Sequence, residues 1–216
     1  PRRVLDPHLV RPGVVQLAGG LQAAPLLGSE LSSGDERRHE AERPEGARHL
    51  DSFTRGIAFR TVAGAGNQTF DYATFLKSQL VAGGFADSDV QVEKLGDTAY
   101  LVARYRGTGK AKNGAKPILI SGHMDVVEAR PADWERDPFT PVIENGYLFG
   151  RGASDNKFDV STFVASMIQL KREGFKPGRD VILLFSGDEE TGMKTTAALA
   201  GQFHDAELLL NIDGGG

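Results

Sequence analysis

The sequence predicts an α/β fold, a layered sheet with helices on its faces. Three short apolar runs, at residues 118–120, 181–185 and 208–210, have the composition of strands that are buried on both faces. Segments with helical patterns separate these runs. Strands and helices that alternate along a chain favour a layered sheet against which the helices pack.

Two helices are expected between the three apolar runs. In the first, apolar residues recur with helical spacing from Val160 to Ile168, and Gly174 is a typical stop signal. A shorter helix is expected over residues 195–203. Both helices would pack against the sheet that the apolar runs form.

The segment before the first apolar run predicts one more helix and a pair of strands. Residues 69–81 place Tyr72, Leu76 and Leu80 on one helical face. Residues 90–94 and 98–105 then alternate between apolar and polar side chains, as two antiparallel strands do.

Residues 1–50 differ in composition from the rest. They contain five of the ten prolines, no aromatic residue, and a run rich in charge from Gly34 to Arg48. Such a composition favours disorder, and Arg2 and Arg3 followed by an apolar stretch also resemble a degraded signal peptide. We therefore expect residues 1–50 to be a disordered or leader-like segment. The location is left open between the cytoplasm and, if this segment is such a signal, export to the periplasm.

The overall composition excludes several classes of protein. The net charge of −4 offers no positive excess to neutralise a phosphate backbone, so we expect no nucleic-acid partner. No run approaches the roughly 18 apolar residues of a membrane span, so none is expected. The chain has no cysteine, which leaves histidine and the carboxylates as its strong metal ligands.

Polar residues follow the apolar runs where functional side chains are expected. His123 follows the first run, and Asp125 could hold its imidazole in one tautomer, although such a pair taken alone more often contains a structural histidine. Asp155 precedes a predicted helix in a segment with two glycines, where it could equally cap that helix.

An acidic triplet provides the stronger signal. Asp188, Glu189 and Glu190 come directly after the second apolar run, and neighbouring carboxylates stay ionised when a cation neutralises them. Asp213 follows the third run. Together with the segment of Asp155, four segments thus offer a histidine or a carboxylate. They fit the rule that α/β sheets bind ligands beyond the carboxyl ends of their strands. One imidazole with oxygen ligands suits Zn²⁺, Co²⁺ or Mn²⁺ better than Ca²⁺ or Mg²⁺.

In their order and spacing, these segments resemble the motifs of the M20 metallopeptidases. That family includes glutamate carboxypeptidases, carnosinase-like dipeptidases, acetylornithine-deacetylase-type deacylases and aminoacylases. The resemblance covers roughly residues 55–216 and implies a zinc-exopeptidase-like catalytic domain. The segments are GHMDVV (122–127), WERDPFTPVIENGYLFGRGASDNK (134–157), SGDEETG (186–192) and LNIDGGG (210–216).

The resemblance implies a role for each candidate residue. His123, Asp155 and Asp213 would bind one divalent metal ion, and Asp155 would bridge to a second ion that Glu190 also binds. Asp125 would orient His123. Glu189 would be the general base that moves a proton from water to the leaving amine. Two divalent ions, Zn²⁺ first and Co²⁺ or Mn²⁺ otherwise, are the implied cofactors.

Full members of that family also carry a lid domain, a possible dimer interface, and a final histidine ligand. Residues 51–216 are therefore expected to be the N-terminal portion of such a catalytic domain, with the lid domain and the C-terminal return absent. By itself the chain is expected to be impaired or inert as a catalyst. His204 is the sole histidine after His123, and we expect it to be a solvated residue rather than the missing ligand.

The predicted function is hydrolysis of the amide bond in short peptides or dipeptides, which releases a terminal amino acid. Two alternatives stay open: removal of an acyl group from N-acyl amino acids, and binding of metal without catalysis. The sequence contains no G-x-S-x-G motif, P-loop or complete G-x-G-x-x-G motif, so an acyl-serine hydrolase or a nucleotide-binding protein has little support.

Overall fold

The computed structural model describes residues 14–16, 45–110 and 114–214. The leader-like character predicted for residues 1–50 therefore falls mostly outside the described residues and stays a prediction. Within the described part, residues 14–16 form a short strand and residue 45 begins a helix that extends to Ile57. The predicted boundary after residue 50 falls inside that helix.

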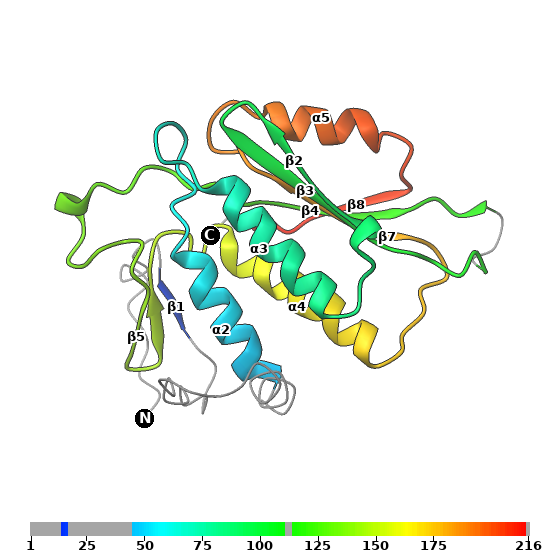
Figure 1. The fold of residues 1–216 in the computed structure, drawn as a ribbon, viewed down its shortest axis with the longest axis horizontal. Coiled ribbons are helices and arrows are strands. Elements are labelled where there is room, and N and C mark those ends of the chain that lie inside the picture. Colours follow the sequence, from blue (N-terminus) through cyan, green and yellow to red (C-terminus); the bar gives the residue numbers. More distant parts are fainter. Residues whose placement is uncertain (1–13, 17–44, 111–113, 215–216) are drawn as a thin grey trace, which may run out of the picture.

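A five-stranded mixed sheet forms the centre of the molecule and confirms the predicted fold class (Figure 1). The antiparallel strands β2 and β3 lie on one side, and β4 pairs in parallel with both β7 and β8. The strands, in their order across the sheet, are β2 (Val90–Leu95), β3 (Thr98–Tyr105), β7 (Val181–Ser186), β4 (Ile118–His123) and β8 (Leu208–Asn211).

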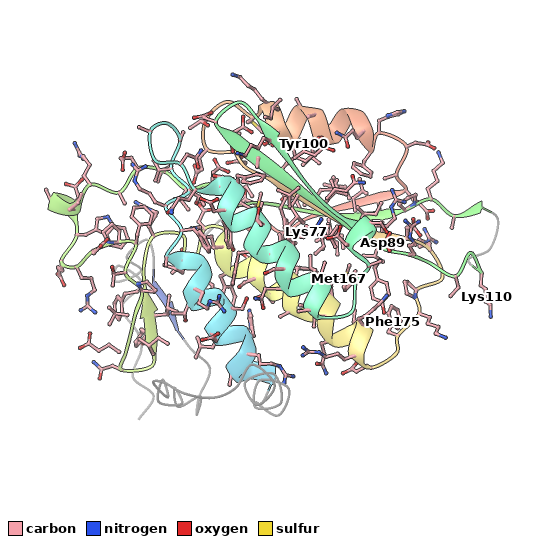
Figure 2. The ribbon with its side chains drawn as sticks, in the orientation of Figure 1. Lys77, Asp89, Tyr100, Lys110, Met167 and Phe175 are labelled. Atoms are coloured by element: carbon pink, nitrogen blue, oxygen red, sulfur yellow. The ribbon has the colours of Figure 1, made fainter. Side chains whose placement is uncertain are left out.

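Helices cover both faces of this sheet (Figure 1). Helices α3 (Thr69–Ala82) and α4 (Lys157–Arg172) pack on one face, and α5 (Lys194–Gln202) packs on the other. Figure 2 shows the two layers of side chains, with Met167 on the α4 side and Tyr100 on the α5 side. The helices and strands that the sequence predicts are thereby confirmed, with ends that differ by a few residues.

A smaller sheet and helix α2 lie beside this core. Strand β6 (Tyr147–Phe149) pairs antiparallel with β1 (Val14–Gln16) and with β5 (Val142–Glu144). Helix α2 (Glu45–Ile57) packs against α4 and buries Phe53 and Ile57 in a cluster with Leu148 of β6. Two 3-10 turns, η2 (Asp87–Asp89) and η4 (Pro131–Asp133), complete the regular elements of the described residues.

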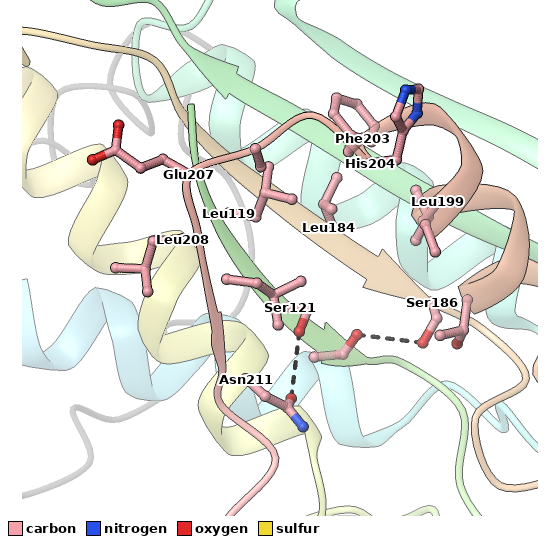
Figure 3. Close-up of a pocket in the computed structure, with 15 residues that line it drawn as sticks. Leu119, Ser121, Leu184, Ser186, Leu199, Phe203, His204, Glu207, Leu208 and Asn211 are labelled. Carbon is pink, nitrogen blue, oxygen red and sulfur yellow. Dashed lines mark hydrogen bonds between the residues drawn. The ribbon is translucent and has the colours of Figure 1, made fainter. Parts of the chain in front are cut away.

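Strand β8 departs from the prediction that all three apolar runs are buried. Its leucines Leu208, Leu209 and Leu210 are 48%, 52% and 46% exposed, so that expectation is wrong for this strand. The reason is position, because β8 forms the edge of the sheet and only β4 pairs with it among the described strands. An apolar pocket of about 480 Å³ lies between β8 and α5, with Leu119 and Leu184 on its floor (Figure 3).

At the start of helix α3, the side chain of Asn67 acts as a cap, although the N-cap residue Gln68 makes no such hydrogen bond. The Asn67 side-chain oxygen accepts hydrogen bonds from the backbone N–H and the hydroxyl of Thr69, at 2.9 and 2.6 Å. Such caps satisfy donors at the helix start that have no partner within the helix. The helix in turn places Tyr72 and Leu76 in the core.

Replacing this cap should destabilise the fold modestly. Asn67→Ala removes the acceptor, and the free energy of unfolding should fall by about 1 kcal/mol. Urea denaturation followed by circular dichroism measures the change. Asn67→Asp keeps the oxygen and should retain stability near that of the wild type; equal stability of all three proteins would show that the cap contributes nothing.

Candidate metal centre

His123 lies at the end of β4 and is almost completely buried. Its Nδ1 lies 3.0 Å from the main-chain oxygen of Asp125 and 3.4 Å from the carboxylate of that residue. Its Nε2 lies 3.0 Å from an oxygen of Asp155 and 3.8 Å from an oxygen of Asp213. One nitrogen of the imidazole, Nδ1, is thus next to Asp125, and the other, Nε2, points at the carboxylates of Asp155 and Asp213.

His123, Asp155 and Asp213 form a group with the composition of a metal site. One ligand atom of each residue lies within 4.8 Å of the others. One nitrogen and two carboxylate oxygens are a donor set that binds zinc and related divalent ions. The side chain of Asp155 is largely exposed, so an ion could enter from solvent. The residues present therefore fit a divalent metal ion.

The carboxylates around His123 also control its protonation. Burial alone would lower the pKa of His123, but the hydrogen bond and charge of Asp125 and the charges of Asp155 and Asp213 raise that pKa to about 9. A proton on the imidazole therefore offsets part of the negative charge of these carboxylates in the metal-free chain. A metal ion that binds Nε2 must displace this proton.

This competition predicts a pH dependence of metal affinity. Below about pH 9 each bound ion releases one proton from His123, so affinity should rise about tenfold per unit between pH 7 and pH 8.5. The free energy of unfolding of the metal-free chain should change with pH in the opposite direction. The raised pKa of His123 stabilises the fold fully below about pH 6.5, and this contribution is lost as the pH rises through about 9.

The affinity is measured by competition with a zinc chelator at several pH values. His123→Gln, which cannot titrate, is the control and should bind weakly with a flatter pH profile. An affinity of the wild-type chain that does not change with pH would contradict the assignment of His123 as a ligand.

Asn156 fixes the relative positions of the three segments. Its side-chain oxygen accepts a hydrogen bond from the backbone N–H of His123, and its amide nitrogen donates to the main-chain oxygen of Ile212, each at 3.4 Å. The approach requires glycine at position 122, because a Cβ there would lie 2.7 Å from the Asn156 oxygen. Asp155 makes no cap for α4, since its carboxylate faces His123 instead.

The acidic triplet divides into one buried side chain and two that are half-buried. Asp188 accepts hydrogen bonds from the backbone N–H groups of Lys194 and Thr195, at 2.8 and 2.9 Å, and so caps α5. Burial, followed by the charge of Asp155, raises the pKa of Glu190. Glu189 and Glu190 lie outside the group of three, so their predicted roles as base and ligand stay predictions.

Lys157 is a buried residue that the sequence reading did not single out. Its ammonium donates to the main-chain oxygens of Gly56 and Phe59, at 3.1 and 2.7 Å, and lies over the ring of Tyr72. Burial lowers the pKa of Lys157 to about 7, and the charge of Asp125 opposes this shift. The signal was present in the sequence, because Lys157 lies three residues before Val160 on the apolar side of α4.

His204 and the apolar pocket do not belong to the site. His204 is exposed after the end of α5, where its Nδ1 lies 2.9 Å from the main-chain oxygen of Gly201. It lines the pocket beside β8 together with Phe203 and Leu199 (Figure 3). His123, Asp155 and Asp213 meet at the carboxyl ends of the strands, and none of the three lines this apolar pocket. Among the described residues, no helix is long and apolar enough to cross a membrane.

Comparison with known proteins agrees with this geometry. Residues 119–215 match the family Peptidase family M20/M25/M40. A probable di- and tripeptidase from Saccharomyces cerevisiae is 32% identical over 72% of the chain and 19% of its own length. A succinyl-diaminopimelate desuccinylase from Acidovorax ebreus is 38% identical over 38% of the chain and 22% of its own length.

Solved structures show the same fold. An M20 family metallo-carboxypeptidase from Sulfolobus solfataricus aligns with a TM-score of 0.65 and 25% identity over 78% of the chain and 37% of the other. Human carnosine dipeptidase 1 aligns with a TM-score of 0.61 and 19% identity over 84% and 40%. The chain therefore spans about a fifth of these curated relatives and about two fifths of these solved chains. By its fold and by the match over residues 119–215, the chain is similar to members of peptidase family M20/M25/M40.

Proposed function

We propose that this chain provides the metal-binding half of a site that hydrolyses the amide bond of short peptides or dipeptides and releases a terminal amino acid. The observation that carries the proposal is the convergence of His123, Asp155 and Asp213 at the carboxyl ends of the sheet strands. The peptidase names of the relatives in yeast and in Sulfolobus support the choice of a peptide substrate.

The proposed roles follow from the donor atoms. His123, Asp155 and Asp213 would hold one divalent ion, and Asp155 with Glu190 would contribute to a second. Divalent ions in such sites polarise a carbonyl group and lower the pKa of water. Zinc is the proposed ion, because a mixed nitrogen and oxygen set suits it.

Glu189 is the proposed general base. It neighbours the proposed ligand Glu190, and its backbone is tied to Asp125 beside His123. From there its carboxylate would take a proton from the attacking water and deliver it to the leaving amine. Asp125 would act on the site through the residues that it contacts.

Deacylation of N-acyl amino acids is the second candidate. The desuccinylase from Acidovorax ebreus, which is 38% identical over 84 residues, favours it. Both reactions break an amide bond next to an amino acid, so the metal group serves either substrate. The third candidate is a protein that binds metal on this fold without catalysis.

The test is a substrate panel with metal supplied. The purified protein is incubated with Zn²⁺, Co²⁺ or Mn²⁺ and with dipeptides, tripeptides and N-acyl amino acids, and released amino acids are quantified. Metal-dependent release from peptides supports the proposal, and a preference for N-acyl amino acids would favour the second candidate. Tight metal binding without any turnover of either kind of substrate, measured on the full-length protein, would contradict both peptide hydrolysis and deacylation.

A further inference from the structure

The buried carboxylate of Asp125 contacts the acidic pair more closely than it contacts His123. Its Oδ1 accepts a hydrogen bond from the backbone N–H of Glu189, and its Oδ2 accepts one from Glu190, each at 3.0 Å. Its distance from Nδ1 of His123 is longer, at 3.4 Å. Both oxygens of one carboxylate are thus used by two consecutive backbone N–H groups.

His123 has a second acceptor that does not depend on this carboxylate. The main-chain oxygen of Asp125 lies 3.0 Å from Nδ1, which is closer than the side chain. An acceptor at Nδ1 is what fixes the tautomer of an imidazole that binds through Nε2. The main-chain oxygen of Asp125 therefore shares with the carboxylate the task that the M20 resemblance implies for the carboxylate.

Glu189 and Glu190 lie in a turn between β7 and α5, where no strand or helix partner is available for their backbone. A buried backbone N–H requires an acceptor, and hydrogen bonds to an ionised acceptor are the stronger kind. Asp125 provides this acceptor from a segment that is itself fixed. The N–H groups of Met124 and Val126 donate to the main-chain oxygens of Ser186 and Thr61, at 2.8 and 3.1 Å.

We propose that Asp125 is a positioning residue for the acidic pair, which fixes the backbone of Glu189 and Glu190 relative to His123, while its main chain orients the imidazole. Its catalytic consequence rests on the proposed function, since Glu189 and Glu190 are the proposed base and ligand. The structural part is independent of any activity.

Amide hydrogen exchange, resolved by residue with NMR in the metal-free chain, tests the structural part. Asp125→Asn keeps the size but presents an NH₂ group to one of the two donors, so exchange at Glu189 and Glu190 should accelerate by about tenfold or more. Unchanged exchange at both amides would overturn the proposal.

Asp188→Asn is the matched control, because Asp188 is the other buried carboxylate that holds backbone N–H groups in this turn. It should accelerate exchange at Lys194 and Thr195 but leave Glu189 and Glu190 protected. Equal acceleration of Glu189 and Glu190 in both variants would mean general loosening and would overturn the proposal.

If Asp125→Asn does not fold, His123→Ala tests whether the carboxylate of Asp125 holds Glu189 and Glu190 without help from the imidazole. The carboxylate then keeps its two donors, so Glu189 and Glu190 should stay protected without the imidazole. Loss of their protection would show that the carboxylate depends on His123, against the proposal.

Zinc affinity and kcat, measured separately on the full-length protein, test the catalytic part of the proposal. Asp125→Asn should lower kcat at least tenfold while zinc affinity stays within about threefold, because the ligand His123 keeps its main-chain acceptor. A loss of zinc affinity of 10- to 100-fold with unchanged kcat of the metal-loaded protein would show that the carboxylate serves His123. Absence of turnover in the wild type would contradict the proposed function, and the exchange result would still stand.

Discussion

Asp155→Ala should abolish metal binding in the micromolar range. Asp155 is one of three groups whose ligand atoms lie within 4.8 Å of one another, and its oxygen lies 3.0 Å from Nε2 of His123. Loss of a residue that only supports a ligand costs 10- to 100-fold in affinity, so loss of a ligand should cost more than about 100-fold. If Asp155 also bridges to a second ion, both ions are lost together.

Chelator competition with zinc measures this effect, and circular dichroism checks that the variant is folded. Asp133→Ala is the matched control, because Asp133 is an exposed aspartate whose partner is Arg130. It should leave the zinc affinity unchanged. Wild-type affinity in folded Asp155→Ala would contradict the assignment of this residue as a ligand.

Glu189→Gln should separate binding from catalysis in the complete gene product. The change keeps the size of the side chain and leaves its backbone hydrogen bond to Asp125 in place, but it removes the proton acceptor. Turnover should fall by roughly 10²- to 10⁴-fold, the range for loss of general base catalysis, while the metal content persists.

Steady-state kinetics and metal analysis of the same preparations test this prediction. Glu144→Gln is the matched control, since Glu144 pairs with Arg136 on the surface of the small sheet. Its turnover should match that of the wild type. Loss of metal from Glu189→Gln as severe as that from Asp155→Ala would mean that Glu189 is a ligand and that the roles of the acidic pair are reversed.

The regular elements were predictable because their signals are local. The helical spacing from Val160 to Ile168 predicts α4, and the alternation over residues 90–94 and 98–105 predicts the antiparallel pair β2 and β3. The exposure of β8 was not predictable in this way. Its apolar run predicts a strand correctly, but burial depends on what packs beyond the edge of the sheet.

The site was partly predictable. The gathering of His123 and Asp213 follows from parallel strands that end at one edge, where residue 121 of β4 is level with residue 211 of β8. Asp155 reaches the same place from the start of α4 and not from a strand end. That placement depends on how α4 packs on the sheet, which is tertiary information.

The contacts that support the site were less accessible to sequence reasoning. Asp188 belongs to an acidic triplet that suggests a single metal-binding role, yet it caps α5. Which of three neighbouring carboxylates turns inward depends on the path of the backbone after β7. The two backbone contacts of Asp125 likewise join segments 64 and 65 residues apart, and no local pattern indicates them.

His123, Asp155 and Asp213 should together bind one Zn²⁺ ion. A crystal structure of the chain grown with Zn²⁺, with anomalous data collected at the zinc edge, tests it most directly. An anomalous peak should appear about 2.0 to 2.2 Å from Nε2 of His123 and from one carboxylate oxygen each of Asp155 and Asp213. An intact fold with no zinc between these three side chains would contradict it.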